Sequence, residues 1–160
     1  MKIVILESLG ISNEELAKVT KPLIDNGHEL VAYDDKVDED TLKDRVKDAD
    51  ILVIANMPLS GDVIDAAKNL KYISVAFTGF DHIDLDKCKE KGIKVSNAGG
   101  YSTNSVAELA FGLMIGLLRN VVVLDGVARE EGTRQGYGQF DLKGKTLGVL
   151  GTGEIGSAVA

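Results

Sequence analysis

Residues 151–156, with the sequence G-T-G-E-I-G, have the spacing of a phosphate-binding turn. An apolar run over residues 145–150 leads directly into them, and a helix-like segment follows. Glycines at this spacing between a strand and a helix are typical of a dinucleotide-binding fold. The alternative is a glycine-rich turn that binds no ligand, but the flanking strand and helix favour nucleotide binding.

Each position in this turn has a physical role. Gly151 permits the tight turn, Gly153 lets a pyrophosphate approach the backbone, and Gly156 lets the helix pack against the strand. The amides of Glu154 and Ile155 would face the phosphates at the start of the helix. A complete site needs about 30 residues and an acidic ribose-binding residue about 20 positions further on. Only four residues follow Gly156, so we expect this chain to bind a cofactor weakly or not at all.

A second candidate site lies where the expected parallel strands end, because ligands bind beyond the carboxyl ends of such strands. The loops at that edge are residues 7–12, 34–38, 56–60, 78–82 and 97–102. The step from Thr78 to Gly79 is the best candidate for an anion site, since its backbone amides are suited to bind a carboxylate. A plain turn capped by Asp81 explains the same residues equally well.

Other reactive side chains have simpler explanations. His82 is the only histidine near this edge, and its sequence neighbours rarely supply the geometry that a general base needs, so we expect a structural role. Cys88 is interpreted as a small inward-facing hydrophobic residue rather than a nucleophile. Arg119 lies near an expected helix end, where a structural role is the leading interpretation. The acidic residues over 34–50 are interpreted as a solvated helix face, and no metal site is predicted.

The elements that position these residues are predicted from apolar periodicity. Five apolar runs of strand length cover residues 2–6, 29–33, 51–55, 72–77 and 93–96. Their continuous apolar character predicts parallel strands that are covered on both faces. Helices fit between them, and their expected N-caps are Ser12, Asp38, Ser60 and Asp84. This alternation predicts a doubly wound, parallel α/β domain.

The pattern changes after residue 100. Residues 102–119 predict a long helix that is apolar nearly all round, with a further capping box expected at Ser105–Glu108. Helix is expected to continue over residues 120–131, followed by an irregular arm at 132–142 and a new strand at 145–150. This change of pattern after residue 100 divides the chain into two parts.

Composition excludes several classes of function. The 160 residues carry a net charge of −7 and contain no Lys/Arg-rich block, so nucleic acid is not expected as a partner. The single cysteine excludes a disulfide framework and a multi-cysteine zinc site, and it suits a reducing cytoplasm. The longest apolar stretch, residues 106–118, falls short of the about 18 residues that indicate a membrane span.

Four segments together resemble the D-isomer-specific 2-hydroxyacid dehydrogenases. They are G-F-D-H-I-D-L at 79–85, G-I-K-V-S-N at 92–97, S-V-A-E at 105–108 and G-K-T-L-G at 144–148, and the glycine turn follows the last of them. The order and spacing match, and the resemblance covers the whole chain. Two departures concern Gly99, where many members have proline, and Tyr137, in an arm where many have tryptophan.

The resemblance implies a flavodoxin-like substrate domain over 1–101. Over 102–160 it implies a linking helix, a dimerisation arm and the truncated start of a Rossmann domain for NAD or NADP. It implies that the amides of Thr78 and Gly79 hold the substrate carboxylate and that Thr78 also touches the cofactor. In the family, hydride passes between the nicotinamide C4 and C2 of the 2-hydroxy or 2-oxo acid. The catalytic arginine, glutamate and histidine of the family lie beyond Ala160, so no catalytic residue is assigned here.

Two functions follow. The first is the N-terminal portion of an NAD-dependent 2-hydroxyacid dehydrogenase, inactive as a 160-residue chain. The second is a non-catalytic, flavodoxin-like binding or oligomerisation module. An apolar helix and an unpaired strand favour a homodimer or a swapped assembly through residues 102–150 in either case. The identity of the 2-hydroxy acid is not predicted.

Overall fold

The computed structural model describes all residues from 1 to 160, and the chain divides into two compact units. The N-terminal unit is Met1–Gly99 and the C-terminal unit is Gly100–Ala160. This division falls two residues before the expected boundary at 101. Each unit has its own secondary structure.

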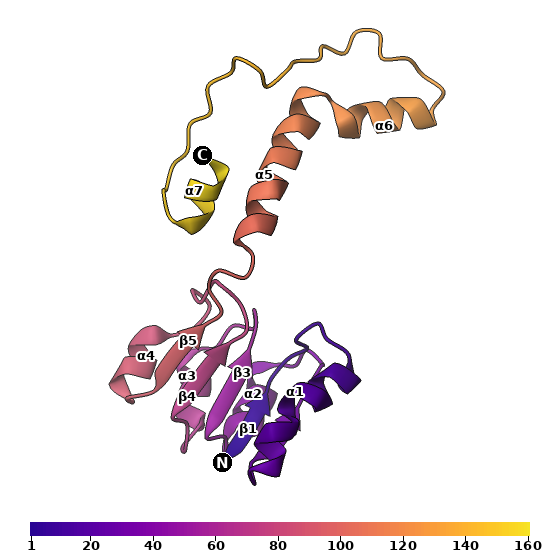
Figure 1. Ribbon diagram of the computed structural model, residues 1–160. Helices are drawn as coiled ribbons and strands as arrows, with labels where there is room; N and C mark the ends of the chain where they lie inside the picture. Colours follow the sequence, from indigo (N-terminus) through magenta and orange to yellow (C-terminus); the bar gives the residue numbers. More distant parts are fainter. The chain divides into compact units, whose positions relative to one another are not determined.

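The N-terminal unit is built on a five-stranded sheet in which every neighbouring pair is parallel (Figure 1). The strands are β1 (Lys2–Ile5), β2 (Glu29–Ala32), β3 (Ile51–Ile54), β4 (Tyr72–Val75) and β5 (Lys94–Asn97). Their order is β2-β1-β3-β4-β5, which is the flavodoxin-like order. The predicted doubly wound α/β fold is confirmed.

Four helices connect these strands, and each begins where its cap predicts. They are α1 (Asn13–Asp25), α2 (Glu39–Val46), α3 (Gly61–Ala66) and α4 (Leu85–Glu90). The side chains of Ser12, Asp38, Ser60 and Asp84 each accept a hydrogen bond from a backbone N–H in the first turn. At α1 the reciprocal bond from the Ser12 N–H to the Glu15 carboxylate is 3.1 Å, which completes a capping box.

The main core lies between the sheet and the helices α2, α3 and α4, whereas α1 lies on the other face (Figure 1). Every second residue of β3 and β4 is buried in this core, and the residues between them are only half-buried. Only β1 has consecutive buried residues. The expectation that all strands are covered on both faces is therefore wrong, because a single helix covers the second face.

The C-terminal unit contains three helices and no strand. They are α5 (Thr103–Leu118), α6 (Val121–Arg129) and α7 (Glu154–Val159). A left-handed residue, Asn120 with φ of 52°, separates α5 from α6. No single helix has both the length and the apolar composition of a membrane span; α5 and α6 meet these criteria only as a pair with a 56° bend between them.

Two local predictions in the C-terminal unit are wrong. Ser105–Glu108 does not begin a helix, because α5 already starts at Thr103, and its N-cap Ser102 makes no side-chain capping bond. Residues 145–150 form no strand. A strand needs a neighbour for its N–H and C=O groups, and this unit offers no other strand.

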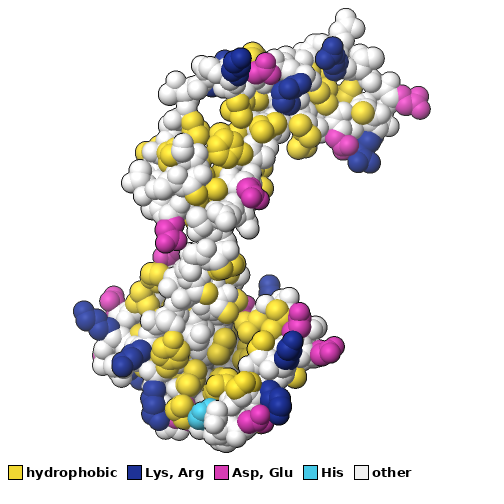
Figure 2. All heavy atoms as spheres, viewed as in Figure 1, with side chains coloured by type: hydrophobic (Ala, Val, Ile, Leu, Met, Phe, Trp, Pro, Cys, Tyr) yellow, Lys and Arg dark blue, Asp and Glu magenta, His cyan; other side chains and the backbone are white.

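The helices α5 and α6 carry a large exposed apolar surface, and hydrophobic side chains gather over them in Figure 2. Leu109, Leu113 and Leu117, spaced four residues apart on α5, are 60%, 65% and 80% exposed. The arm returns to the end of α5, where the Phe140 N–H donates to the Leu118 carbonyl at 3.0 Å. Isolated exposed apolar residues are ordinary, but a continuous stripe indicates an interaction surface.

Candidate functional site

The carboxyl ends of the five strands form one edge of the N-terminal unit, and the loops that follow them are brought together there. The order in which successive strands are added to the sheet reverses at β1, since β2 lies on one side of β1 and β3 on the other. In open parallel sheets, ligands bind at this point because the loops diverge and leave a crevice. The structure has a cleft of about 560 Å³ at this position.

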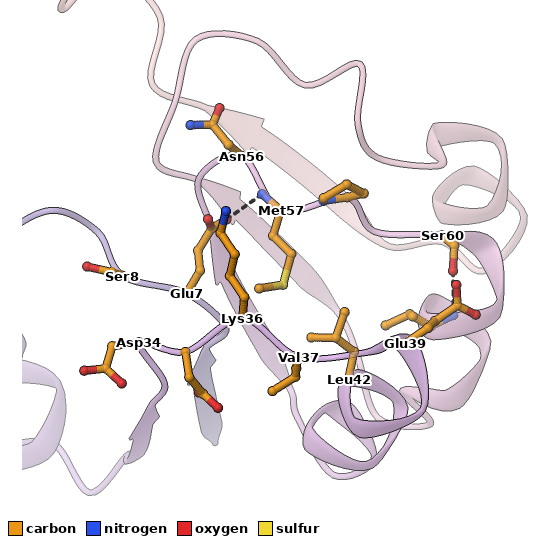
Figure 3. A pocket seen from close by; sticks show the side chains of 13 residues that line it. Glu7, Ser8, Asp34, Lys36, Val37, Glu39, Leu42, Asn56, Met57 and Ser60 are labelled. Carbon is orange, nitrogen blue, oxygen red and sulfur yellow. Dashed lines mark hydrogen bonds between the residues drawn. The ribbon is translucent and has the colours of Figure 1, made fainter.

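The cleft lies between the loops that follow β1, β2 and β3 (Figure 3). Its apolar surface comes from Val37, Leu42, Met57, Pro58 and Val63, and its polar rim from Glu7, Ser8, Asp34, Asp35, Lys36, Glu39, Asn56 and Ser60. Two of the rim carboxylates are neutralised by neighbouring cations. Asp35 lies 2.8 Å from Arg45, and this pair holds the pKa of Asp35 below its usual value. Lys43, 2.9 Å from Glu39, lowers the pKa of Glu39 in the same way.

Glu7 fixes the loop that follows β3. A single oxygen of its carboxylate, Oε1, accepts hydrogen bonds from the Ala55 N–H and the Met57 N–H, both at 2.7 Å. The Met57 bond is drawn in Figure 3. Glu7 lies in one of the predicted edge loops, and no role was predicted for it. The available signal was a lone carboxylate directly after a buried strand.

Glu7→Ala is expected to lower the free energy of unfolding by about 2 kcal/mol, because two half-buried N–H groups lose their acceptor. Glu7→Gln is the matched control, since its amide oxygen still accepts both bonds. Urea unfolding followed by circular dichroism measures both values. Equal losses in the two variants would show that the negative charge, rather than the acceptor, stabilises the loop.

The Thr78–Gly79 step lies at the same edge, in the loop that follows β4, and both residues are half-buried. Neither the Thr78 N–H nor the Gly79 N–H donates to any protein group. The loop is held instead through its other atoms: the Asn97 side-chain amide donates to the Thr78 carbonyl at 2.7 Å. Two adjacent backbone donors are therefore free to bind an anion, and the loop that carries them is anchored to β5.

The loops after β3 and β4 are joined through the backbone. Leu59 and Ile83 form an isolated parallel bridge, and the Leu59 N–H donates to the His82 carbonyl at 2.9 Å. The His82 side chain is half-buried, and its Nε2 is buried without a hydrogen-bond partner. No carboxylate is bonded to its ring, so the arrangement that a general base requires is not formed.

The remaining candidates are structural. Cys88 is buried in the core, and this burial raises the pKa of its thiol, which disfavours the nucleophilic thiolate. Its predicted inward-facing position is confirmed. Arg119 follows α5 directly and contacts Gln139 at 3.2 Å and Asp141 at 3.8 Å. It thus ties the end of α5 to the arm.

The glycine turn belongs to the C-terminal unit. Gly151 has φ of 94°, a left-handed conformation that favours glycine. At Gly156 a Cβ atom would lie 1.9 Å from the Gly151 carbonyl oxygen, so only glycine fits. At Gly153 a Cβ atom would meet nothing within 4 Å, which leaves the backbone open to approach. The turn therefore combines close packing at Gly156 with an open backbone at Gly153, as a phosphate-binding turn requires, and these residues fit the pyrophosphate of a dinucleotide.

Comparison with known proteins places these features in a family. Residues 3–154 match the family model described as D-isomer specific 2-hydroxyacid dehydrogenase, catalytic domain. A hydroxypyruvate reductase of Thermotoga maritima is 40% identical over 151 residues, which cover 92% of this chain and 49% of that protein. The chain spans about half the length of the curated relatives that it matches.

Solved structures agree. An NAD-dependent formate dehydrogenase from Staphylococcus aureus in complex with NAD has a TM-score of 0.86 and 30% identity, with 100% of this chain and 52% of that chain covered. A D-lactate dehydrogenase from Aquifex aeolicus complexed with NAD and lactic acid has a TM-score of 0.80 and 29% identity, with 98% and 46% covered. Because the family model matches nearly the whole sequence, the chain belongs to the D-isomer specific 2-hydroxyacid dehydrogenase family.

Proposed function

We propose that this chain is the N-terminal portion of an NAD-dependent oxidoreductase that acts on the CH–OH group of a small 2-hydroxy acid and reduces the corresponding 2-oxo acid. The observation that carries the proposal is the close packing of Gly156 against the Gly151 carbonyl, in a chain of this family. A turn so tightly closed, with an open backbone at Gly153, has the requirements of pyrophosphate binding. The chain's half-length match to its relatives supports its being one portion of the enzyme.

The substrate carboxylate is assigned to the backbone amides of Thr78 and Gly79. Both N–H groups are free of protein acceptors, and both residues are half-buried at the edge where parallel sheets bind ligands. Adjacent backbone N–H groups bind anions without placing a positive side chain in the site. A 2-hydroxy or 2-oxo acid offers a carboxylate of the required kind.

The cofactor is assigned to the turn. Its contacting residues are Gly151, Gly153, Glu154, Ile155 and Gly156, and Thr78 is a further contact. The bound nicotinamide would carry the hydride to or from the substrate. NAD is favoured because the solved relatives include complexes with NAD, and NADP is the alternative. The binding affinity of the 160-residue chain is expected to be weak or absent.

The 160-residue chain is expected to show no turnover, because the arginine, glutamate and histidine that the family uses have no counterparts among its residues. The test is NADH oxidation by the purified chain with pyruvate, glyoxylate and hydroxypyruvate as substrates. A D-lactate dehydrogenase with pyruvate serves as the positive control. Oxidation above the buffer rate would show that this chain contains its own catalytic groups.

The assembly is proposed to be a homodimer or a swapped assembly through residues 102–150. The exposed leucine stripe of α5 supports it, since such a surface is ordinarily covered by another protein surface. The same observation favours a second candidate function, a non-catalytic oligomerisation module. Translation that continues past Ala160 in the native gene supports the enzyme, and a stop codon there supports the module. We place either protein in the cytoplasm, away from membranes and nucleic acids.

A further inference from the structure

Asn97 makes an unusual connection at the end of β5. The parallel ladder between β4 and β5 runs to the pair Val75 and Asn97. Beyond this pair the Ala98 N–H donates to the Phe77 carbonyl at 3.0 Å, and the Asn97 side chain then reaches the Thr78 carbonyl at 2.7 Å. The side-chain amide thus takes the place of the next backbone donor, because the chain turns away after residue 98.

This bond acts on the neighbouring N–H through the peptide plane. The carbonyl of Thr78 and the N–H of Gly79 belong to one peptide group, which is planar and trans, so they point in opposite directions. A donor that fixes the carbonyl therefore fixes the direction of the N–H. It also polarises the group, because hydrogen bonds in series strengthen one another. The Gly79 N–H itself has no protein acceptor, and a Cβ atom at Gly79 would meet nothing within 4 Å.

We propose that Asn97 is a positioning residue for carboxylate binding: by holding the Thr78 carbonyl it directs and polarises the Gly79 N–H towards the anion. This inference rests on the proposed substrate site at Thr78 and Gly79. Asn97 does not touch the anion itself. A second hydrogen bond, from the Thr78 hydroxyl to the Ala98 carbonyl at 3.4 Å, holds only the Thr78 side chain. The orientation of the peptide group between Thr78 and Gly79 therefore depends on Asn97.

Asn97→Leu tests the inference, since leucine has a similar volume but no donor. We expect the dissociation constant for glycolate, measured by NMR titration of the Thr78 and Gly79 amides in the 160-residue chain, to rise about tenfold. The free Gly79 amide nitrogen signal is also expected to move, because the preceding carbonyl loses its hydrogen bond. Asn97 is exposed, so the melting temperature is expected to change little.

Two further variants separate positioning from general support of the sheet. Asn97→Gln retains an amide donor and is expected to recover part of the affinity. Ser96→Ala removes the neighbouring side-chain bond between β5 and β4, which joins Ser96 to the Tyr72 hydroxyl. That variant does not touch the Thr78 carbonyl, so its glycolate affinity is expected to equal that of the unaltered chain.

The outcomes are distinguishable. If the unaltered chain binds glycolate at Thr78 and Gly79 and Asn97→Leu binds equally well, the role of Asn97 is refuted while the substrate site stands. An equal loss in Asn97→Leu and Ser96→Ala refutes it as well, in favour of general support. If glycolate does not perturb these two amides in the unaltered chain, the substrate assignment fails, and the inference about Asn97 fails with it.

Discussion

Gly156→Ala is expected to unfold α7 and open the glycine turn. The new Cβ atom would lie 1.9 Å from the carbonyl oxygen and 2.9 Å from the carbonyl carbon of Gly151, and backbone atoms cannot rotate away as a flexible side chain does. Overpacking of this kind costs about 3 kcal/mol, and a six-residue helix has no stability of its own to offset it. Two backbone hydrogen bonds would be lost: the one that the Ser157 N–H donates to the Gly153 carbonyl and the one that the Ala160 N–H donates to the Gly156 carbonyl.

Amide hydrogen exchange measures this loss. The exchange rates at Ser157 and Ala160 are expected to rise roughly 100-fold, since each factor of ten corresponds to about 1.4 kcal/mol. Gly153→Ala is the matched control, because its φ of −68° suits alanine and its Cβ atom would meet nothing within 4 Å. Unchanged exchange rates in Gly156→Ala would show that the turn adjusts to the methyl group while α7 stays folded. Close packing of Gly156 on the Gly151 carbonyl would then not be required.

The pair of variants also separates two roles in a complete enzyme. Gly156→Ala disrupts the packing of α7 on the Gly151 carbonyl, whereas Gly153→Ala leaves α7 folded and adds a methyl group where a pyrophosphate approaches. Both are expected to weaken NADH binding, but only the first is expected to alter exchange in the absence of NADH. This contrast distinguishes a phosphate-binding turn from a purely structural one.

The Leu113→Lys/Leu117→Lys double variant is expected to convert a dimer of about 34 kDa, twice 17.1 kDa, into a monomer near 17.1 kDa. The two side chains are 65% and 80% exposed and four residues apart, so they lie on one face of α5. Burying a leucine contributes about 1.5–3 kcal/mol, and burying an unpaired lysine is unfavourable. The dimer dissociation constant is therefore expected to rise by more than about 100-fold.

Light scattering over a concentration series provides the measurement. Val19→Lys is the control: Val19 is 63% exposed on α1, in the other unit, and this substitution is expected to leave the mass unchanged. A mass near 17.1 kDa for the unaltered chain would contradict the proposed assembly directly. A double variant that remains dimeric would move the interface away from this face of α5.

Much of the fold was predictable because its signals are local. Each N-cap side chain accepts a hydrogen bond from the backbone N–H three residues further on, so a short stretch of sequence contains both partners. These caps are Ser12, Asp38, Ser60 and Asp84. The five strands of the N-terminal unit were predicted to within a few residues because each lies in a short apolar run of strand length. The glycine turn was predictable for the same reason, since Gly151 and Gly156 meet across only five positions.

Local signals failed where a distant partner was needed. Residues 145–150 have the composition of a strand but have no neighbour in their unit, and the Ser105–Glu108 pair lies inside a helix that begins earlier. Coverage of the sheet's second face likewise depends on how many helices pack there, which the apolar runs do not state.

The sequence by itself determined the five strands and four helix starts of the N-terminal unit, the family and the glycine turn. Only the tertiary structure decided how the edge loops are held. Glu7 accepts hydrogen bonds from N–H groups 48 and 50 positions away, and the Asn97 side chain donates one to a carbonyl 19 positions away. Nothing near either residue in the sequence indicates these partners. The physical reason is that a hydrogen bond depends on distance in space, and parallel strands bring their ends together only after the intervening helices have packed.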